Sequence, residues 1–137
     1  MEIRRATTVA EIAAAGPLFD HPARPEWAGR FLAADGHHLF LARTDAAGPP
    51  VGFVSGVETL HPDKGAEMFL YELAVAEPYR RRGIGRALVL RLAALAQERG
   101  CYGMWVGVDA GNDVALAAYR SAGGEDDGRC TVVTWAF

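Results

Sequence analysis

The feature that most constrains the fold is a basic, glycine-containing run that lies between an apolar segment and a segment with helical spacing. The run Arg80–Arg86 reads Arg-Arg-Arg-Gly-Ile-Gly-Arg and follows the apolar segment Met68–Val75. After it, apolar residues recur at the spacing of one helix face: Ile84, Leu88, Leu92 and Leu95. A strand, a short turn, a loop and a helix in this order direct backbone N–H groups and the positive helix end to one place. The sequence therefore predicts a binding site for a phosphate or diphosphate.

The glycines and arginines of this run have different roles. Gly83 and Gly85 lack a Cβ, so phosphates can approach the main chain there. The arginines add charge and forked donors. A solvated basic corner would also explain the arginines, but the flanking strand and amphipathic helix favour a ligand site. A Rossmann-type dinucleotide loop is disfavoured, because its three-glycine spacing and its acidic residue on a second strand are absent.

Composition indicates one globular domain over residues 1–137. The chain has 137 residues, of which 50% are hydrophobic and 23% charged, which suits a single packed core. The net charge of −3 argues against a general nucleic-acid-binding protein, which would carry a broad basic face. A local basic loop on a mildly acidic protein suits an anionic cofactor better.

Other classes of site find little support in the sequence. Cys101 and Cys130 are the two cysteines and do not form a disulfide framework. No signal peptide follows Met1 and no apolar window reaches the length of a membrane span, so we expect a cytoplasmic protein that does not associate with membranes. The four histidines lack zinc-site spacing. His37 and His38 would point to opposite faces of a strand, and we expect no metal.

Turn residues and periodicity predict an α+β domain. The expected strands are Glu2–Ala6, His38–Ala42, Val51–Leu60, Glu67–Val75, Met104–Val108 and Arg129–Phe137. The expected helices are one capped by Thr7 or Thr8, one that begins near Pro25, one that ends near Gly100, and Asp113–Ala122. The strands around residues 38–75 form an antiparallel meander. Because a helix intervenes, the Met104 strand should run parallel to the strand that ends at Val75.

The pattern Arg-x-x-Gly-x-Gly after a strand resembles the acetyl-CoA loop of the GNAT superfamily of N-acetyltransferases. The element order matches over residues 1–137, and the specific motifs cover residues 69–124. The segments Tyr71–Val75 and Tyr119–Gly124 are also similar to the aminoglycoside 3-N-acetyltransferase branch. The resemblance implies a mixed, mostly antiparallel twisted sheet with a splayed parallel strand pair, flanked by about four helices. It assigns acetyl-CoA contacts to Leu73, Ala74, Val75, Arg80, Arg81, Arg82, Gly83, Ile84, Gly85, Arg86, Ala87, Asn112, Leu116 and Tyr119.

Two residues are candidates for catalysis by direct transfer to an amine. Glu72 interrupts an apolar strand, on the same alternation as Met68, Leu70 and Ala74 unless a bulge intervenes. Partial burial there would raise its pKa toward that of a useful base; the alternative is an edge-strand glutamate that meets solvent or an arginine. The resemblance implies that Tyr119 protonates the departing thiolate, and the alternative is a core tyrosine.

The acceptor is the least specified part. The candidate substrate residues are Asp20, Glu67, Tyr71 and Asp109, and further carboxylates are Asp35, Glu58 and Glu125–Asp127. We expect Trp27 and Phe31 to be packing residues. The chain after the last helix holds one strand where many family members have two, which leaves a homodimer possible. The expected function is acetylation of an aminoglycoside, at its 3-N position, or of a similar small amine. The alternatives are acetylation of a protein N-terminus or lysine, and acyl-CoA binding without turnover.

Overall fold

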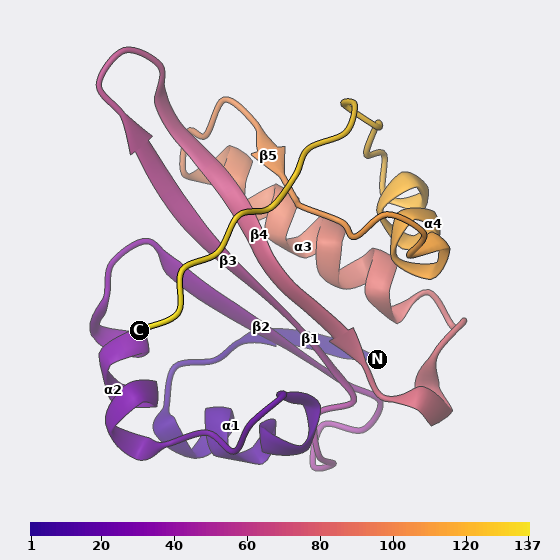
Figure 1. Cartoon of the computed structure of the whole chain (residues 1–137). Helices are drawn as coiled ribbons and strands as arrows, with labels where there is room; N and C mark the ends of the chain where they lie inside the picture. The colour runs from indigo at the N-terminus through magenta and orange to yellow at the C-terminus, as the bar shows by residue number, and fades with distance from the viewer.

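A five-stranded sheet with helices on both faces forms the centre of the molecule (Figure 1). The computed structural model describes all residues 1–137. The strands are β1 (Glu2–Arg5), β2 (His37–Arg43), β3 (Gly52–His61), β4 (Gly65–Val75) and β5 (Met104–Trp105). The α-helices are α1 (Val9–Ala14), α2 (Pro25–Ala33), α3 (Ile84–Glu98) and α4 (Asp113–Ser121), and short 3₁₀ turns are η1 (Gly16–Leu18) and η2 (Glu77–Tyr79).

The strand order is β1-β2-β3-β4-β5, with antiparallel pairing from β1 to β4 and parallel pairing of β4 with β5. The parallel pair follows from the α3 crossover between the two strands, as expected. The pairing covers only Met68 with Met104 and Phe69 with Trp105. Beyond Phe69, the edge of β4 that faces β5 has no strand partner. The predicted α+β fold with a splayed parallel pair is confirmed.

Each face of the sheet carries its own hydrophobic core. The α3-side core contains Phe40, Ala42, Val51, Val54, Met68, Leu70, Ile84, Leu88, Val89, Leu92, Leu95 and Ala96. The α1/α2-side core contains Ala6, Ile12, Ala15, Ala28, Leu39, Leu41 and Phe53. The predicted helical face of α3 is therefore buried along its length. Burial of apolar side chains on both faces fixes the sheet register.

Local signals in the sequence set the helix boundaries. Thr8 caps α1 in a capping box with Glu11, and Pro25 occupies the first turn of α2. Asn112 caps α4 by accepting a hydrogen bond from the Ala115 N–H at 3.2 Å. Gly100 follows α3 with φ +77°, the left-handed conformation that favours glycine after a helix. These predicted helix boundaries are confirmed to within a few residues.

A β-bulge in β4 changes which residues face which core. The β3–β4 register pairs Ser55 with Glu72 but Gly56 with Leu70, so Tyr71 is the extra residue. Before the bulge, Leu70 belongs to the α3-side core; after it, Leu73 packs against that core and Ala74 against the α1/α2-side core. The prediction that Glu72 shares a face with Met68 and Leu70 is therefore wrong, because one inserted residue reverses the alternation. Glu72 lies on the α1/α2 side.

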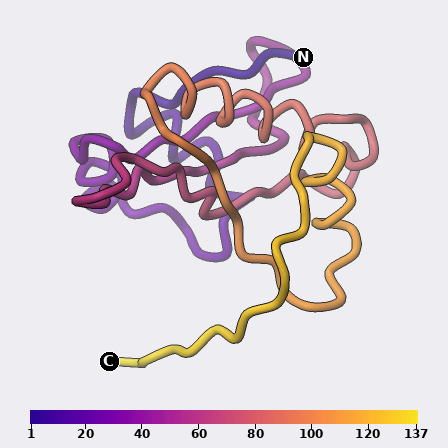
Figure 2. Tube along the Cα trace, turned by 90° about the horizontal axis from the view of Figure 1, so that it is seen from above, coloured from indigo at the N-terminus to yellow at the C-terminus, as the bar shows by residue number.

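Two predicted strands differ from the structure. The strand predicted over Met104–Val108 ends at Trp105, where β5 splays from β4. The prediction of a strand over Arg129–Phe137 is wrong: this segment has no regular structure and pairs with no strand. It crosses ahead of β4 and β3 in Figure 1 and stands clear of the body in Figure 2. The very short β5 offers too little ladder for a further strand to pair with.

One aromatic side chain also departs from its predicted role. Trp27 was expected to pack in the core, but it is 57% exposed, with the Arg24 guanidinium 4.5 Å from its ring centroid. The inner face of α2 is formed instead by Ala28, Phe31 and Leu32, which contact the α1/α2-side core. The prediction for Phe31 is confirmed and that for Trp27 is wrong, because one helical face holds only part of the apolar set.

Candidate functional site

The loop before α3 leaves a run of backbone donors unused. Arg81 has φ +61° and Gly83 has φ +79°, so the backbone is in the left-handed conformation at two positions just before the helix begins. No side chain caps α3, and the N–H groups of residues 81–86 donate to no backbone acceptor, whereas that of Ala87 bonds the Gly83 carbonyl. The free amides therefore end at Arg86. With the positive end of a 15-residue helix, they are suited to binding an anion.

The arginines hold the loop in place. Arg80 Nε donates to the Val75 carbonyl at 2.9 Å, and Arg86 Nε donates to the Ser121 carbonyl at 2.7 Å. The Arg82 guanidinium lies 5.5 Å from the centroid of the Tyr79 ring. These contacts tie the loop to the end of β4, to α4 and to η2. Each of the three arginines therefore also has a structural role.

The space around the loop fits a diphosphate. A Cβ built on Gly83 would meet no atom within 4 Å, and one on Gly85 would make only ordinary contact with Val75 at 3.8 Å. Packing within the protein therefore does not require glycine at either position. Gly83 is required by its positive φ, and both glycines leave the main chain open to a ligand. Free amides, open space and flanking arginines suit the phosphates of an acyl-CoA.

The splayed edge of β4 continues this site toward the sheet. The Ala76 N–H donates to the Val51 carbonyl of the neighbouring segment at 2.8 Å. By alternation, the main-chain groups of Leu73 and Val75, rather than those of Ala74, face the open edge. The Val75 carbonyl already accepts the Arg80 bond. The edge that a pantetheine arm would pair with thus centres on Leu73.

Glu72 is placed where a carboxylate is poorly stabilised. The residue as a whole is solvent-exposed, but partial desolvation of its carboxylate raises its pKa, and the charge of Asp20 raises it further. Asp20 comes from the segment after η1, so two elements that are far apart in sequence meet here. A raised carboxylate pKa brings the group closer to the range of a general base at neutral pH.

Tyr119 and Leu116 lie on α4, beyond the loop. Tyr119 is partly buried against the α3-side core, and burial raises the pKa of its hydroxyl. A phenol held in its protonated form is able to donate a proton. Asn112, at the start of the same helix, is occupied in capping, so its amide nitrogen is the part left for a ligand.

The predicted substrate residues do not form one cluster. Glu67 hydrogen-bonds the Tyr102 hydroxyl and lies 3.4 Å from His61 Nε2, near the tip of the β3–β4 hairpin. Tyr71 is 62% exposed and packs edge-on against Phe69 at 5.6 Å. Asp109 is exposed in the loop before α4. Only Asp20 is coupled to Glu72.

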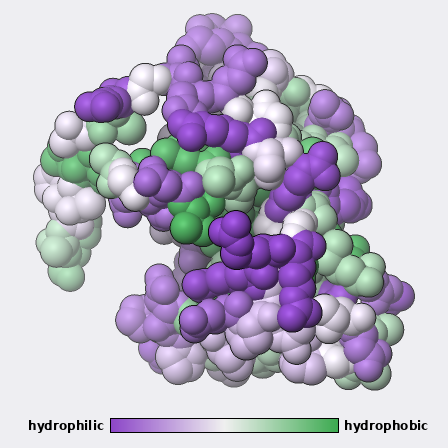
Figure 3. Space-filling model, turned by 90° about the vertical axis from the view of Figure 1, so that its right-hand side faces the viewer, coloured by the Kyte–Doolittle hydropathy of each residue, from purple (hydrophilic) through white to green (hydrophobic).

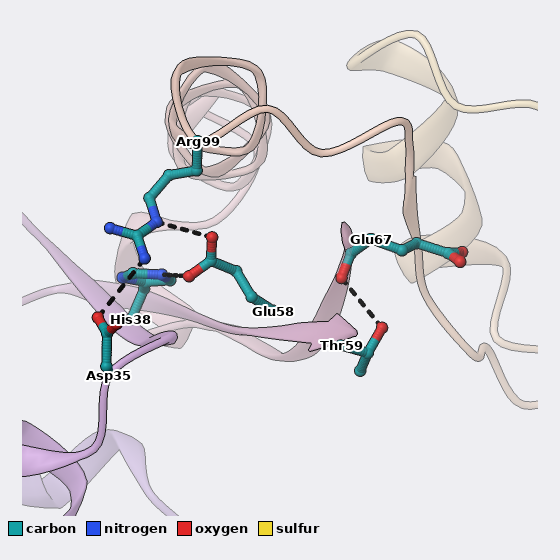
Figure 4. A network of polar contacts seen from close by, with 6 residues as sticks. All are labelled: Asp35, His38, Glu58, Thr59, Glu67 and Arg99. Atoms are coloured by element: carbon teal, nitrogen blue, oxygen red, sulfur yellow. Dashed lines mark hydrogen bonds and ion pairs between the residues drawn. The ribbon is translucent and has the colours of Figure 1, made fainter. Parts of the chain in front are cut away.

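Three of the remaining carboxylates that were proposed for an acceptor pocket, Asp35, Glu58 and Asp126, have protein partners. Glu58 binds Arg99 Nε at 2.7 Å and His38 Nε2 at 3.1 Å, and Asp35 lies 3.5 Å from Arg99 (Figure 4). Asp126 pairs with Arg120. Figure 4 also shows the Glu67 carbonyl as the acceptor of the Thr59 hydroxyl at 3.0 Å. Asp35, Glu58 and Asp126 therefore contribute to the fold, and Asp20 is the one carboxylate whose charge raises the pKa of Glu72.

Two residues near the site escaped the sequence reasoning. Trp105 stacks on Phe69, with centroids 4.4 Å apart and an angle of 22° between the ring planes. Ser55 lies opposite Glu72 on β3. The signal that could have identified Ser55 is a hydroxyl within the apolar segment Val51–Val54 and its continuation. Figure 3 shows a hollow between the body and the arm that follows α4.

Other classes of site were also considered across the whole chain. No three or more His, Cys, Asp or Glu side chains form a group able to hold a metal ion. None of the helices has both the length and the apolar character needed to cross a membrane.

The sequence is similar to known proteins over most of its length. A sequence profile described as the acetyltransferase (GNAT) family matches residues 6–123. The ribosomal protein bS18-alanine N-acetyltransferase of Escherichia coli is 40% identical over 57 residues, which cover 42% of this chain and 38% of the relative. The N-alpha-acetyltransferase RimI of Mycobacterium tuberculosis is 35% identical over 104 residues, or 76% of this chain and 62% of the relative. The match thus spans less than two thirds of either relative.

Solved structures resemble the fold closely. An aminoglycoside acetyltransferase from an uncultured soil metagenomic sample, in complex with sisomicin, has a TM-score of 0.90 at 19% identity and covers 99% of this chain and 95% of its own. An aminoglycoside N-acetyltransferase AAC(6')-Iy in complex with CoA has a TM-score of 0.81 at 20% identity and covers 99% and 100%. At these identities the likeness concerns the fold.

Proposed function

The chain belongs to the acetyltransferase (GNAT) family, and on that premise we propose that residues 1–137 form one domain that transfers an acetyl group from acetyl-CoA to a primary amine. Members of this family use acetyl-CoA. The observation that carries the proposal is the run of unbonded amides over residues 81–86 at the N-terminus of α3. It adjoins the open edge of β4, which also bears Glu72.

The proposed chemistry is direct transfer, with this chain's residues in separate roles. Acetyl-CoA, when bound, supplies an acyl group activated as a thioester. Amides 81–86 hold its diphosphate, and the Leu73 N–H on the open edge of β4 polarises the thioester carbonyl. Glu72 removes a proton from the acceptor amine, directly or through a water, and Tyr119 gives a proton to the departing sulfur. Holding the two reactants together contributes much of the acceleration.

A peptide α-amine is the acceptor that these observations favour. An α-amino group has a pKa of about 7.7–8.0, against about 10.4 for lysine. A carboxylate base therefore removes a proton more easily from an α-amine than from a lysine side chain. Two carboxylates that could have attracted a polycationic acceptor, Glu58 and Asp126, are instead paired with arginines. The exposed Tyr71 and the stacked Phe69–Trp105 pair offer apolar surface for a peptide. The two relatives named above act, by their names, on an alanine and on N-alpha amines.

An aminoglycoside or similar small polyamine, with acetylation at the 3-N position as the sequence suggests, is the second candidate. Its support is the electrostatic coupling of Asp20 with Glu72, since paired carboxylates suit a polycation. The aminoglycoside acetyltransferases with the same fold are consistent with it. Two carboxylates are few for a ligand that carries several positive charges, which is why this acceptor comes second.

A thiol-release assay with acetyl-CoA tests the proposal. Wild type is compared across peptides with free α-amines, the same peptides with blocked α-amines but free lysines, polyamines and aminoglycosides. We expect turnover with free α-amines and a strong loss in Glu72→Gln. Turnover restricted to aminoglycosides would show that an aminoglycoside, and not a peptide α-amine, is the acceptor. Acetyl-CoA binding without thiol release from any amine would indicate a non-catalytic acyl-CoA-binding module.

A further inference from the structure

The hydroxyl of Ser55 is a buried polar group without a partner. Ser55 is 6% exposed, and its Oγ makes no hydrogen bond within the protein. Buried hydroxyls are normally hydrogen-bonded, because an unmet donor in an apolar setting is costly. Its neighbours on β3 belong to the two cores, Val54 on one side and Phe53 on the other. The position therefore calls for a polar partner close to Ser55.

The sheet register brings one such partner to Ser55. Ser55 pairs with Leu39 on β2 and with Glu72 on β4, and the bulge at Tyr71 sets Glu72 on the α1/α2 face. Leu39 belongs to the α1/α2-side core, so Ser55 projects to that same face. Directly opposite residues have Cβ atoms about 4.5–5.5 Å apart, within reach of a serine hydroxyl and a glutamate side chain or of one bridging water.

Glu72 is also short of donors. Burial and the charge of Asp20 raise its pKa, and no hydrogen bond from the protein opposes them. Because Glu72 is solvent-exposed and receives no hydrogen bond from the protein, its carboxylate is free to turn among its rotamers. That is a poor arrangement for a base that must meet an amine in one direction. A single donor beside it would both orient the carboxylate and favour its ionised form.

We propose that Ser55 is a positioning residue for Glu72: its hydroxyl donates a hydrogen bond to the Glu72 carboxylate, directly or through one water, and holds it toward the acceptor. This inference rests on the proposed function, in which Glu72 is the base. The alternative is that Ser55 is only a small residue that fits between the cores, in which case alanine would serve equally well.

Two substitutions separate hydrogen bonding from packing. Ser55→Ala removes the donor and leaves a smaller side chain, whereas Ser55→Cys leaves a slightly larger one with a weak donor. The volume changes are opposite in sign, but both variants lose the strong donor. Thr59→Val on the same strand is the control, because it removes a hydroxyl that bonds the Glu67 carbonyl far along the hairpin.

The first readout is the pKa of Glu72 itself, from ¹³C NMR titration of the side-chain carboxyl, with its signal assigned by loss in Glu72→Gln. We expect both Ser55 variants to raise this pKa by about one unit, since a hydrogen bond to the ionised form is lost, and Thr59→Val to leave it unchanged. This measurement needs no turnover. An unchanged pKa in both Ser55 variants, with their folds intact, would overturn the inference.

The second readout is the pH dependence of kcat/KM. We expect the acid limb to move to higher pH in both Ser55 variants, with kcat reduced about tenfold near its midpoint and KM little changed. If Glu72→Gln removes the limb but the Ser55 variants do not move it, Ser55 has no positioning role and the proposed base stands. If Glu72→Gln retains the limb, the proposed base and the inference both fail.

Discussion

At the scale of single residues, the proposed chemistry depends on Glu72, whose ionised form the fold disfavours. Glu72 interrupts an apolar strand, and the structure adds two reasons for its raised pKa, burial and Asp20. The sequence alone shows that Glu72 is a charged residue within a hydrophobic run. The face of the sheet on which Glu72 lies could not be predicted, because the bulge at Tyr71 reverses the alternation and depends on how β3 pairs with β4.

Glu72→Gln should separate activity from stability. We expect kcat to fall about 10²–10⁴-fold, the usual range for loss of a general base. Because folding raises the pKa of Glu72, its ionised form destabilises the folded state at neutral pH, so the melting temperature should be no lower than that of wild type. Thermal unfolding and steady-state kinetics on one preparation check both. Lower stability with normal kcat would mean that Glu72 has a structural role.

Tyr119→Phe tests the other catalytic residue. The substitution keeps the ring that packs against the α3-side core and removes only the hydroxyl. We expect kcat to fall about 10²-fold, with little change in the affinity for acetyl-CoA measured by calorimetry. A normal kcat together with weaker cofactor binding would instead make Tyr119 a contact residue.

At the scale of elements, the sequence predicted whatever depends on local patterns. The α3 face, the Thr8 and Asn112 caps and the strands of the meander all follow from periodicity and capping chemistry within a few residues. The errors concern long-range pairing: β5 stops at Trp105 and the segment over Arg129–Phe137 finds no partner. A strand needs a neighbouring edge, and sequence near the strand does not reveal whether that edge exists.

The loop before α3 allows a matched pair of glycine substitutions. Gly83 has φ +79° and Gly100, after the other end of the same helix, has φ +77°; a Cβ at either position meets nothing within 4 Å. Replacement of either glycine by alanine should therefore lower the free energy of unfolding by about 1–2 kcal/mol through backbone strain alone. Only Gly83→Ala should also weaken coenzyme A binding, because its Cβ intrudes where the phosphates approach.

Denaturant unfolding and calorimetric titration with coenzyme A give the two quantities for each variant. Equal losses of affinity in Gly83→Ala and Gly100→Ala would attribute the effect to strain in α3. Such a result would remove the case for close approach of a ligand to Gly83.

At the scale of the whole molecule, a polar cluster joins the far end of α3 to the sheet (Figure 4). Arg99 follows α3, Glu58 lies on β3, and the fully buried His38 lies on β2. The His38 Nε2 donates to a carboxylate, so Nε2 carries the proton and Nδ1 is left without a partner. Sequence reasoning assigned Glu58 to a possible acceptor pocket, because its partners are 20 and 41 positions away.

This cluster should make stability pH-dependent. Burial lowers the pKa of His38, and this effect outweighs the opposing effect of the hydrogen bond that His38 donates to Glu58. The unfolded chain takes up a proton below about pH 6.5 that the folded state resists, so the free energy of unfolding should fall as pH drops from 7.5 to 5.5. Hydrogen bonds donated by Arg99 and His38 lower the pKa of Glu58, and the stabilisation from its ionised form is lost only at more acidic pH.

His38→Gln keeps a donor for Glu58 but does not titrate, so it isolates the histidine. Urea unfolding at several pH values should give a flatter dependence between pH 7.5 and 5.5 in this variant than in wild type. Identical slopes in the two proteins would show that His38 is protonated equally in both states.

The central claim is that the amides of residues 81–86 receive the diphosphate of coenzyme A. The most direct measurement is a ¹H–¹⁵N NMR titration of the protein with coenzyme A and, separately, with pantetheine, which lacks the diphosphate. The account predicts large amide shifts for residues 81–86 that saturate together with coenzyme A and are absent with pantetheine. Saturable binding of coenzyme A that leaves these amides unshifted would contradict it.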